Sequence, residues 1–552
     1  MPVAIRPTRS LRRPLSGLGA LLGVKLPADR EVRPVPPGTM LPNGPGPEGA
    51  VCGVTHDSRM VRPGDLYAAL PGTRAHGAEF SAAAVAAGAV AIFTDPAGRD
   101  RAAAAGVPVY VVADPRSRLG EVACWVYGDP SRKLRLIGVT GTSGKTTTSY
   151  LAEAGLRMAG HVTGLIGGVE TRIGTDVQPS ELTTPEATDL QALLAAMAER
   201  DVTAAAMEVS SHALALGRVA ATHYDVAVFT NLSQDHLDFH ADLEDYFATK
   251  AELFTPRYAR AGVVNLDDAF GQRLAAGAPI PITTFSAAGN PAADWRADSV
   301  RVGADGSAFR VIGPGGVEAD ASLALVGRFN VANALGAIVA LVEEGIGLDD
   351  AVAGVRSCAG VPGRLERVGG GGAAPDLPGS LPGSLSAYLP DLTVLVDYSH
   401  KPGAVEAVLG ALRPVTQGNL IIVLGCGGDR DRAKRPLMGA AAAALADVAI
   451  FTTDNPRSED PLAILAAMLD GATGVPPSRR AHVIVEPDRT AAIGLAVSSA
   501  AKGDVILVAG KGHERGQYVA GRVLPFDDRE VTAEALRHRA AAYRAAHPRG
   551  EL

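Results

Sequence analysis

The chain has 552 residues, of which 47% are hydrophobic and 20% are charged. At about 150 residues per domain this length predicts three or four domains, and the composition excludes global disorder. The 52 basic and 59 acidic residues give a net charge of −7, which argues against a nucleic-acid partner. The longest uncharged apolar run, residues 82–93, is too short to span a bilayer, so we expect no stable membrane insertion.

The N-terminal sequence and the cysteines indicate whether the protein is exported or stays in the cytoplasm. Arginines at positions 6, 9, 12 and 13 precede the apolar residues 15–24, as in an export signal, but no small-residue cleavage site follows. The leucines of this stretch have helical spacing and predict a short amphipathic helix instead. The four cysteines form no C-x-x-C pair, which argues against a disulfide scaffold or a zinc ribbon. We therefore expect a cytoplasmic protein.

Further along the chain, short apolar runs alternate with helical stretches. A Pro- and Gly-rich segment, residues 27–50, predicts a flexible loop. A compact unit with the runs VAIF (90–93) and VPVYVV (107–112) follows it. From residue 134 a second unit begins, and strands are predicted at LRLIGV (134–139), AAAMEV (204–209), DVAVFT (225–230) and GVVNL (262–266). Strands that alternate with helices predict a parallel, doubly wound sheet.

A Gly- and Pro-rich stretch, residues 369–390, predicts a surface insertion before the third unit. Five successive strand–helix steps then predict another mostly parallel sheet, with a ligand crevice beyond the carboxyl ends of its strands. The sequence therefore predicts an α/β protein of three domains, at residues 1–131, 132–364 and 365–552.

The sharpest chemical signal is an apolar strand that runs into a glycine-rich turn and then a helix. Backbone N–H groups of such a turn bind phosphate oxygens, and the helix N-terminus adds positive potential. Lys145 should reach the β- and γ-phosphates, and the Thr146 hydroxyl should bind Mg²⁺. Val139 stands where the strict motif has its first glycine. The predicted ATP-binding turn comprises Gly141, Thr142, Ser143, Gly144, Lys145, Thr146 and Thr147.

The phosphate loop leaves three classes of enzyme open. A simple NTPase transfers the phosphoryl group to water, a kinase to a hydroxyl, and a ligase to a carboxylate. Glu208 ends a predicted strand, where its carboxylate can face the loop and hold Mg²⁺. His236 and His240 have the spacing of a zinc helix, but Leu237 occupies the position of the required glutamate. Lys250 by itself is typical of an exposed helical lysine.

Several separated motifs decide among these classes. They are GTSGKTT (141–147), MEVSSHAL (207–214), TNLSQDHLDFH (230–240), GRFNVANALGA (327–337) and VPGRLE (361–366). Together they resemble the Mur ligases of peptidoglycan synthesis, in that family's order. The resemblance implies an N-terminal UDP-binding α/β domain, a central P-loop ATPase with a parallel sheet and a C-terminal Rossmann-like domain. It also implies that ATP and Mg²⁺, as two ions, are the cofactors.

The resemblance also assigns residues to the nucleotide and the metal. It implies that Asn333 approaches the adenine, Arg364 the phosphates and Asp397 the ribose, although asparagine at a helix start is also typical of a cap. Lys250 resembles the family's carbamylated lysine, which as an anion could hold a second Mg²⁺. The implied catalytic residues are Lys145, Lys250 and His236, and the implied metal ligands are Thr146, Glu208, His236 and the Lys250 carbamate.

Two regions resemble the segments that bind the UDP-sugar dipeptide. One is THDSRMVRPGDLYAALPGTRAHGAEF (55–80), and the other comprises TTPEATDLQ (183–191) with SSHALALGRV (210–219). Without the other motifs, the first would be typical of a turn-rich connection. The residues implied are His56, Ser58, Thr73, Arg74, Ala75, Thr183, Thr184, Ser210 and Arg218.

The amino-acid pocket is implied by the third unit. Its glycine-rich turns, 423–436 and 509–517, both miss the G-x-G-x-x-G pattern, so a nicotinamide site is not expected. DNPR (454–457) resembles the signature of members that add diaminopimelate, whose distal carboxylate a guanidinium can bind bidentately. Lysine would place an ammonium there, which Arg457 would repel. The implied pocket comprises Arg430, Asp454, Asn455, Pro456, Arg457, Gly510 and Glu514.

We therefore expect a ligase in which ATP phosphorylates the D-glutamate carboxylate of UDP-N-acetylmuramoyl-L-alanyl-D-glutamate and diaminopimelate attacks the acyl phosphate. Its partners would be these small molecules, and we expect a monomer. Two related alternatives are the same ligation with L-lysine and a folylpolyglutamate-type ligase. A third, from another class, is a nucleotide-sugar binding protein or plain NTPase. The sequence does not distinguish meso- from LL-diaminopimelate.

Overall fold

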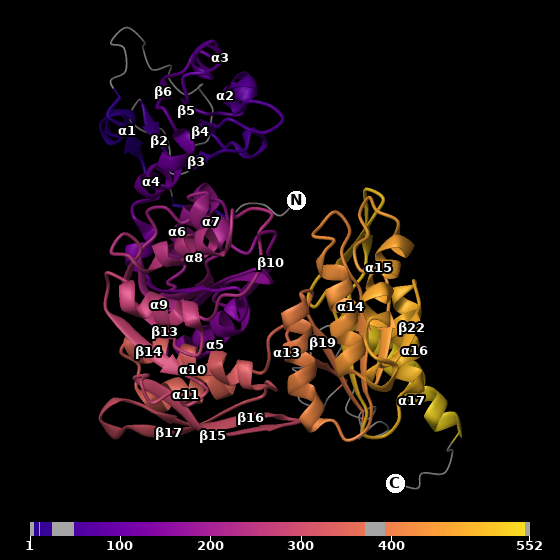
Figure 1. The fold of residues 1–552 in the computed structure, drawn as a ribbon. Coiled ribbons are helices and arrows are strands. Elements are labelled where there is room, and N and C mark those ends of the chain that lie inside the picture. The colour runs from indigo at the N-terminus through magenta and orange to yellow at the C-terminus, as the bar shows by residue number, and fades with distance from the viewer. Residues whose placement is uncertain (1–4, 10, 25–48, 370–391, 547–552) are drawn as a thin grey trace. The chain divides into compact units, whose positions relative to one another are not determined.

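A computed structural model describes residues 5–9, 11–24, 49–369 and 392–546 (Figure 1). The predicted loop 27–50 and insertion 369–390 lie almost wholly outside the described residues. The chain forms two compact units. Unit 1 comprises Met1–Phe285, Ala292–Asp294 and Gly336–Gly354, and unit 2 comprises Ser286–Pro291, Trp295–Leu335 and Val355–Leu552. The predicted domain boundaries near 131 and 364 stay predictions.

Unit 1 begins with a four-stranded sheet of order β3-β4-β5-β6, in which every pair is parallel. The predicted alternation of strand and helix is confirmed here. The elements are β1 (Arg13–Pro14), α1 (Leu15–Leu22), β2 (Ala50–Val51), β3 (Gly53–Thr55), β4 (Asp65–Ala69), α2 (Ser81–Ala86), β5 (Ala91–Thr94), α3 (Arg99–Ala103), β6 (Val109–Val111) and α4 (Pro115–Tyr127).

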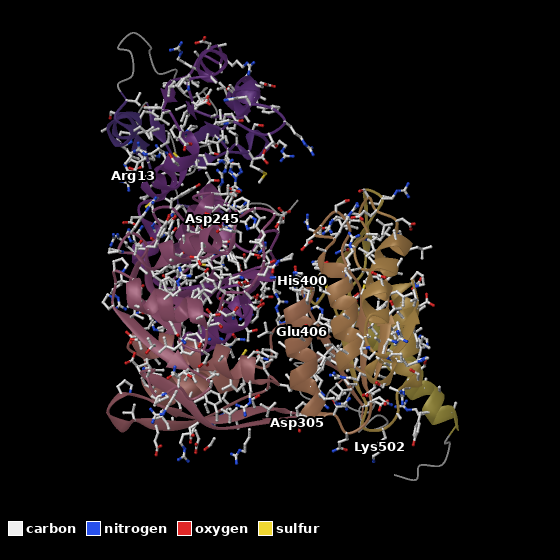
Figure 2. The ribbon with its side chains drawn as sticks, in the orientation of Figure 1. Arg13, Asp245, Asp305, His400, Glu406 and Lys502 are labelled. Carbon is white, nitrogen blue, oxygen red and sulfur yellow. The ribbon has the colours of Figure 1, made fainter. Side chains whose placement is uncertain are left out.

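The N-terminal arginines are bonded into this part of the fold. Arg6 Nη1 donates to both carboxylate oxygens of Asp65, at 2.9 and 2.7 Å. Arg13, labelled in Figure 2, donates from Nε to the carbonyl of Trp125 at 3.0 Å. The backbone N–H groups of Thr8 and Arg9 donate to Glu199 at the end of α6 (Ala187–Glu199). Contacts of Arg6, Thr8, Arg9 and Arg13 therefore tie the N-terminal segment to both parts of unit 1.

The larger sheet of unit 1 has the order β10-β9-β8-β11-β7-β12-β13-β14. The pairs from β8 to β14 are parallel, and β9 and β10 pair antiparallel. Its strands are β7 (Arg135–Thr140), β8 (Thr163–Ile166), β9 (Glu170–Ile173), β10 (Asp176–Pro179), β11 (Ala204–Glu208), β12 (Tyr224–Phe229), β13 (Ala259–Asn265) and β14 (Ile282–Ser286). Its other helices are α5 (Lys145–Met158), α7 (Ser211–Ala215), α8 (Leu243–Ala251) and α9 (Ala269–Gly277). The chain passes between the units within α10 (Arg328–Glu343) and α11 (Leu348–Ser357).

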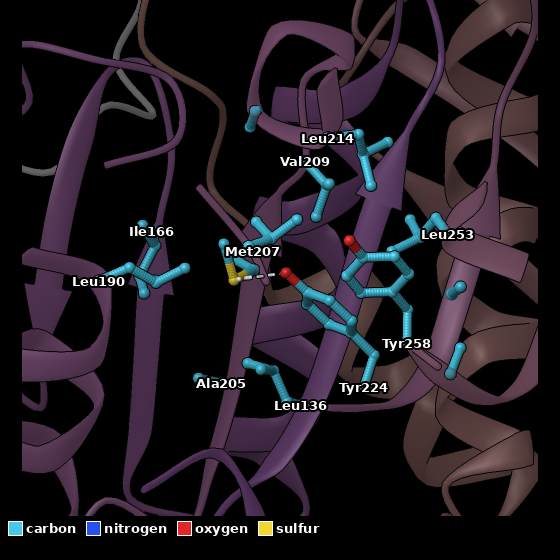
Figure 3. Close-up of a cluster of buried hydrophobic side chains, with 14 of the residues drawn as sticks. Leu136, Ile166, Leu190, Ala205, Met207, Val209, Leu214, Tyr224, Leu253 and Tyr258 are labelled. Carbon is cyan, nitrogen blue, oxygen red and sulfur yellow. Dashed lines mark hydrogen bonds between the residues drawn. The ribbon is translucent and has the colours of Figure 1, made fainter. Parts of the chain in front are cut away.

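One hydrophobic cluster packs against β7 and β11, the two central strands of this sheet (Figure 3). Tyr224 is buried, and its hydroxyl donates to Met207 Sδ at 3.5 Å. A Cβ at Gly138 would lie 2.6 Å from the ring of Tyr224, so the ring packs directly on the β7 backbone. This packing holds β7 and β11 in register, and the loops that follow both strands carry predicted site residues.

Unit 2 contains three strands that pair antiparallel, β15 (Trp295–Gly303), β16 (Gly306–Ile312) and β17 (Glu318–Leu323). Its main sheet has the order β18-β19-β23-β20-β21-β22 and is parallel except for β18, as the sequence predicted. The strands are β18 (Glu366–Val368), β19 (Thr393–Asp397), β20 (Leu420–Leu424), β21 (Val448–Phe451), β22 (His482–Val485) and β23 (Val505–Ala509), with a separate hairpin of β24 (Gly516–Val519) and β25 (Arg522–Pro525). The helices are α13 (Pro402–Leu412), α14 (Lys434–Leu445), α15 (Pro461–Thr473), α16 (Arg489–Ser499) and α17 (Asp528–Ala546). None of the described helices is both long and apolar enough to cross a membrane.

Glu344 is a buried carboxylic acid in unit 1. We predict that it makes the free energy of unfolding depend on pH. Burial, with Asp225 nearby, raises the pKa of Glu344 to about 7. The fold therefore favours the neutral acid, a contribution present below the unfolded pKa near 4.5 and lost as the pH rises through 7. We expect Glu344→Gln to leave stability unchanged at pH 4.5 and to raise it at pH 8, by on the order of 1–3 kcal/mol.

Thermal and denaturant unfolding of both proteins at the two pH values measures this difference. The matched control is Glu343→Gln, at the next position, whose carboxylate accepts a hydrogen bond from Thr283 at 2.6 Å. The control should show no gain at pH 8. Equal stabilisation of Glu344→Gln at both pH values would contradict the role given to its charge.

Candidate active site

The phosphate loop follows β7 and has the backbone that the sequence predicts. Gly141 and Gly144 have φ values of +146° and +89°, which favour glycine. A Cβ at Gly141 would lie 1.9 Å from Thr230 Oγ1, so no other residue fits there. The loop leads directly into α5, which begins at Lys145. Its N–H groups are thus placed at a helix N-terminus, where phosphate binds.

Two residues after β12 hold this loop, and neither was predicted as a site residue from the sequence. Thr230 Oγ1 and Asn231 Nδ2 donate to the Ser143 carbonyl at 2.7 and 3.0 Å, and Ser143 N donates back to Asn231 Oδ1 at 3.1 Å. The signal was available, because β12 pairs in parallel with β7 and both strands end at the same edge. Residues that follow neighbouring parallel strands meet at that edge.

Thr146 and Glu208 form the best candidate for a metal site. Thr146 Oγ1 donates to Glu208 Oε1 at 3.1 Å, and Gly168 N donates to the same oxygen at 2.9 Å. Both side chains are buried. No group of three or more His, Cys, Asp or Glu side chains in the described ranges is arranged to hold a metal ion. One hydroxyl and one carboxylate fit Mg²⁺, which binds few protein ligands and completes its shell with phosphates and waters.

Two lysines converge on the carbonyls of the phosphate loop. Lys145 Nζ donates to the carbonyls of Gly141 and Thr142 at 2.8 and 3.1 Å. Lys250 Nζ, from α8, donates to the Gly141 carbonyl at 3.0 Å and lies 4.6 Å from the centre of the Tyr246 ring. Lys250 is 1% exposed, so the reading of an ordinary exposed lysine is wrong. The predicted Lys145 and Lys250 therefore lie together.

His236 lies beside this group, within a cluster of aromatic side chains. Its Nε2 lies 3.0 Å from Asp235, and its ring meets the Tyr246 ring edge-on at 6.0 Å. Tyr246 also hydrogen-bonds Thr142 of the phosphate loop through their hydroxyls, at 3.2 Å. Neither Tyr246 nor His212 was singled out from the sequence, although Tyr246 precedes Lys250 by one helical turn.

His212 is the most perturbed member of this cluster. Its ring stacks on Phe239 at 4.1 Å and meets His236 edge-on at 4.8 Å. Burial, together with the neighbouring histidines, lowers the pKa of His212 to about 4. This lowered pKa favours the neutral form of His212 at pH 7.

Three of the residues predicted for the dipeptide meet behind Glu208. Thr184 Oγ1 donates to the Glu208 carbonyl at 2.9 Å and accepts from Ser210 N at 3.1 Å. Arg218 Nη1 donates to the Thr184 carbonyl at 3.4 Å, and Arg218 Nε lies 2.9 Å from Glu186. Thr183, also predicted, lies against Gly168, where a Cβ would be 3.1 Å from its Oγ1. A single cluster therefore joins them to the candidate metal site.

The residues predicted for the uridine end lie on two loops. His56 Nδ1 lies 3.0 Å from Thr188 Oγ1 on α6, and Ser58 begins the short helical turn Ser58–Met60. Thr73 and Arg74 are exposed and Ala75 is half-buried in the loop after β4. Their role in binding stays a prediction.

The residues predicted for the adenine, the ribose and, in the case of Arg364, the phosphates of ATP lie in unit 2. Asn333 Nδ2 donates to Asn330 Oδ1 at 3.1 Å within the first two turns of α10. Arg364 lies over the Tyr398 ring at 4.5 Å. Asp397 accepts from the backbone N–H groups of Leu365 and Ser399, both at 2.8 Å. Asp397 thus orders its own loop, and contact of these residues with nucleotide stays a prediction.

The residues predicted for the amino acid meet at the carboxyl edge of the unit 2 sheet. Asn455 Nδ2 donates to Glu514 Oε2 at 2.8 Å, and Gln517 Nε2 donates to the Asp454 carbonyl at 2.9 Å. A Cβ at Gly510 would lie 2.8 Å from Asp454 Oδ2, so a side chain at position 510 would collide with that carboxylate. Lys511, which was not predicted, is fully buried among these groups.

Arg457 is held beside this group by two backbone contacts. Its φ is +52°, and its N–H and carbonyl bond to Tyr518 and Ala520 at the end of the β24–β25 hairpin, at 2.9 and 2.7 Å. Its Nη1 donates to the Gly428 carbonyl at 2.6 Å. A Cβ at Gly428 would lie 1.9 Å from the Pro456 carbonyl, so Gly428 and Pro456 touch closely. Arg430 is exposed on the same loop.

Three family profiles match successive parts of the chain. Residues 50–127 match the profile described as Mur ligase family, catalytic domain; residues 139–341 match the Mur ligase middle domain; and residues 386–512 match the Mur ligase, glutamate ligase domain. A protein of Streptomyces coelicolor named UDP-N-acetylmuramoyl-L-alanyl-D-glutamate--2,6-diaminopimelate ligase is 56% identical over 96% of this chain and 98% of its own length. The chain belongs to the Mur ligase family.

Other comparisons agree with this membership. A relative of the same name from Corynebacterium glutamicum is 48% identical over 89% of this chain and 92% of its own length. A solved ligase of that name has a TM-score of 0.62 at 31% identity, over 93% of this chain and 99% of that one. A folylpolyglutamate synthase from Mycobacterium tuberculosis has a TM-score of 0.55 at 20% identity, over 77% and 95% of the two chains, which shows likeness of fold alone. This Mur ligase family member therefore has the α/β architecture that the sequence predicted.

Proposed function

We propose that the chain is an ATP-dependent ligase that joins diaminopimelate to the D-glutamate of UDP-N-acetylmuramoyl-L-alanyl-D-glutamate. The observation that carries the proposal is 56% identity, over almost the whole length of both chains, to a relative that bears this enzyme's name. The phosphate loop and the Asp454–Arg457 turn supply the two chemistries that the reaction requires. A ligase explains both of these sites, whereas a plain NTPase explains only the first.

Unit 1 would bind the phosphates of ATP and the UDP-dipeptide. The N–H groups of residues 141–147 would bind the phosphates, and Lys145 would turn from the loop carbonyls to the β- and γ-phosphates. Thr146 and Glu208 would hold Mg²⁺, which neutralises phosphate charge when bound. A second ion would need a further anion, and the buried position of Lys250 beside the loop supports its proposed carbamylation.

The two chemical steps follow from the groups in place. The D-glutamate carboxylate oxygen attacks the γ-phosphorus, the bond to the β–γ bridging oxygen breaks, and ADP leaves. The neutral amine of diaminopimelate then attacks the acyl carbon, phosphate leaves with the former carboxylate oxygen, and the nitrogen loses a proton. Catalysis rests on alignment and on Lys145 balancing the charge of the transferring group.

Unit 2 would select the amino acid. Gly428 engages only Nη1 of Arg457, and a guanidinium carries five N–H donors, so Nε and Nη2 can bind a distal carboxylate. This arrangement favours diaminopimelate over lysine. The proposed protein is cytoplasmic and monomeric.

An amine panel tests the proposed function. ADP release is measured with ATP, Mg²⁺ and the UDP-dipeptide plus meso-diaminopimelate, LL-diaminopimelate, L-lysine or no amine. We expect rapid release with one or both diaminopimelate isomers and release at least about 100-fold slower with lysine or without amine, because lysine lacks the distal carboxylate and would leave the Arg457 guanidinium without its partner. Equal release without amine would instead support a plain NTPase.

A further inference from the structure

Lys511 follows Gly510 in the loop after β23 and is 0% exposed. Burying a lysine ammonium without partners would cost several kcal/mol. Its Nζ donates to Asn455 Oδ1 at 2.9 Å and to Glu514 Oε2 at 3.1 Å, and it lies 3.6 Å from Asp454 Oδ1. All three partners belong to the predicted amino-acid pocket.

These contacts fix how the pocket presents its charges. Asn455 is bonded on both sides, because its Oδ1 also accepts from Tyr518 N at 3.1 Å and its Nδ2 donates to Glu514. Lys511 engages one oxygen of each carboxylate, Oδ1 of Asp454 and Oε2 of Glu514. The other oxygen of Asp454 faces Gly510, and the Glu514 side chain is 31% exposed.

The charges of this group do not balance without a ligand. Asp454 and Glu514 carry two negative charges, and Lys511 carries one positive charge. The nearby Arg489 is fully buried against Asp528, at 2.7 Å, and that pair is neutral. Arg457, beside this group, donates to the Gly428 carbonyl and is assigned to the substrate carboxylate. Asp454, Glu514 and Lys511 together therefore keep one negative charge, which a substrate ammonium would neutralise.

We propose that Lys511 is a positioning residue of the amino-acid pocket, whose ammonium orients Asp454, Asn455 and Glu514 to receive the ammonium of an amino-acid zwitterion. This inference rests on the proposed function. It assigns the ammonium of the non-reacting end of diaminopimelate to this group and the carboxylate of that same end to Arg457. Lys511 does not touch the substrate and acts through the three side chains that it holds.

A double-mutant cycle tests the inference. We expect Lys511→Met to raise the KM for diaminopimelate 10- to 100-fold, while the KM values for ATP and the UDP-dipeptide change less than about twofold, as charged hydrogen bonds are lost from one site only. Glu514→Gln should also raise the KM for diaminopimelate. In the Glu514→Gln background Lys511→Met should add less than about threefold, because residues that act through one another are not additive.

Two controls keep the test decisive. Lys502→Met, an exposed lysine of the same unit, should leave every KM unchanged (Figure 2). If Lys511→Met alone does not fold, the double variant still reports, because it removes the ammonium together with the Glu514 carboxylate and leaves only Asp454 without its ionic partner, and its KM should match that of Glu514→Gln. An unchanged KM in Lys511→Met, or multiplicative effects in the cycle, would overturn the inference. Failure of the wild type to depend on diaminopimelate would instead overturn the proposed function.

Discussion

Lys145→Ala should lower kcat for ADP formation by roughly 10³-fold or more. Lys145 is the first residue of α5, and its ammonium already lies within 2.8 Å of the loop backbone that would surround the phosphates. Alanine removes the only charge that the loop itself brings to the transferring phosphoryl group. Steady-state ADP release with saturating substrates measures the loss.

The same variant should bind the UDP-dipeptide normally. The residues proposed for that substrate, such as Thr184 and Ser210, are bonded to each other and to Glu208, and none of their contacts involves Lys145. Calorimetric titration should therefore give an unchanged Kd. Lys133→Ala, an exposed lysine just before β7, is the matched control and should keep full activity. More than a tenth of wild-type activity in Lys145→Ala would contradict the assignment.

Arg457→Asn should raise the KM for diaminopimelate about 10- to 100-fold, the effect of losing a charged, bidentate hydrogen bond. Asparagine is the informative replacement because Arg457 has a φ of +52°, which asparagine tolerates. The guanidinium is thereby removed while the backbone bonds to Tyr518 and Ala520 can persist. The ratio of kcat/KM for diaminopimelate to that for L-lysine should fall in parallel.

Arg457→Lys separates charge from geometry. A lysine keeps the positive charge but lacks the planar fork, so it should recover only part of the lost affinity. Arg479→Ala, an exposed arginine elsewhere in unit 2, is the control and should behave as wild type. A wild-type preference for diaminopimelate in Arg457→Asn would show that another residue reads the distal carboxylate.

The sequence was sufficient for the fold and for the phosphate loop because both depend on local patterns. Alternating apolar runs mark the strands of both main sheets, and the positive φ values of Gly141 and Gly144 follow from the glycines themselves. The burial of Lys250, in contrast, could not be predicted from a local pattern. Exposed and buried residues alternate along its helix, α8, so the local sequence does not show that Lys250 is buried. Its burial depends on neighbours in space, which include Tyr246 and the Gly141 carbonyl.

Lys511 was missed for a related reason. A lysine in a glycine-rich turn is typical of an exposed or phosphate-binding residue, and its three partners are 56, 57 and 3 residues away in sequence. Thr230 and Asn231 were part of a recognised motif, but their bonds to Ser143 depend on the order of strands in the sheet. The local pattern of apolar residues predicts where a strand lies in the sequence, but it does not predict the order of the strands in the sheet.

The central claim is that a carboxylate, and not water, accepts the phosphoryl group. The amine panel reaction tests it most directly when the D-glutamate side-chain carboxylate of the UDP-dipeptide carries oxygen-18. We expect one labelled oxygen in each phosphate released with diaminopimelate, detected by mass spectrometry or by the ³¹P NMR isotope shift. Phosphate that carries oxygen from water alone would contradict the account.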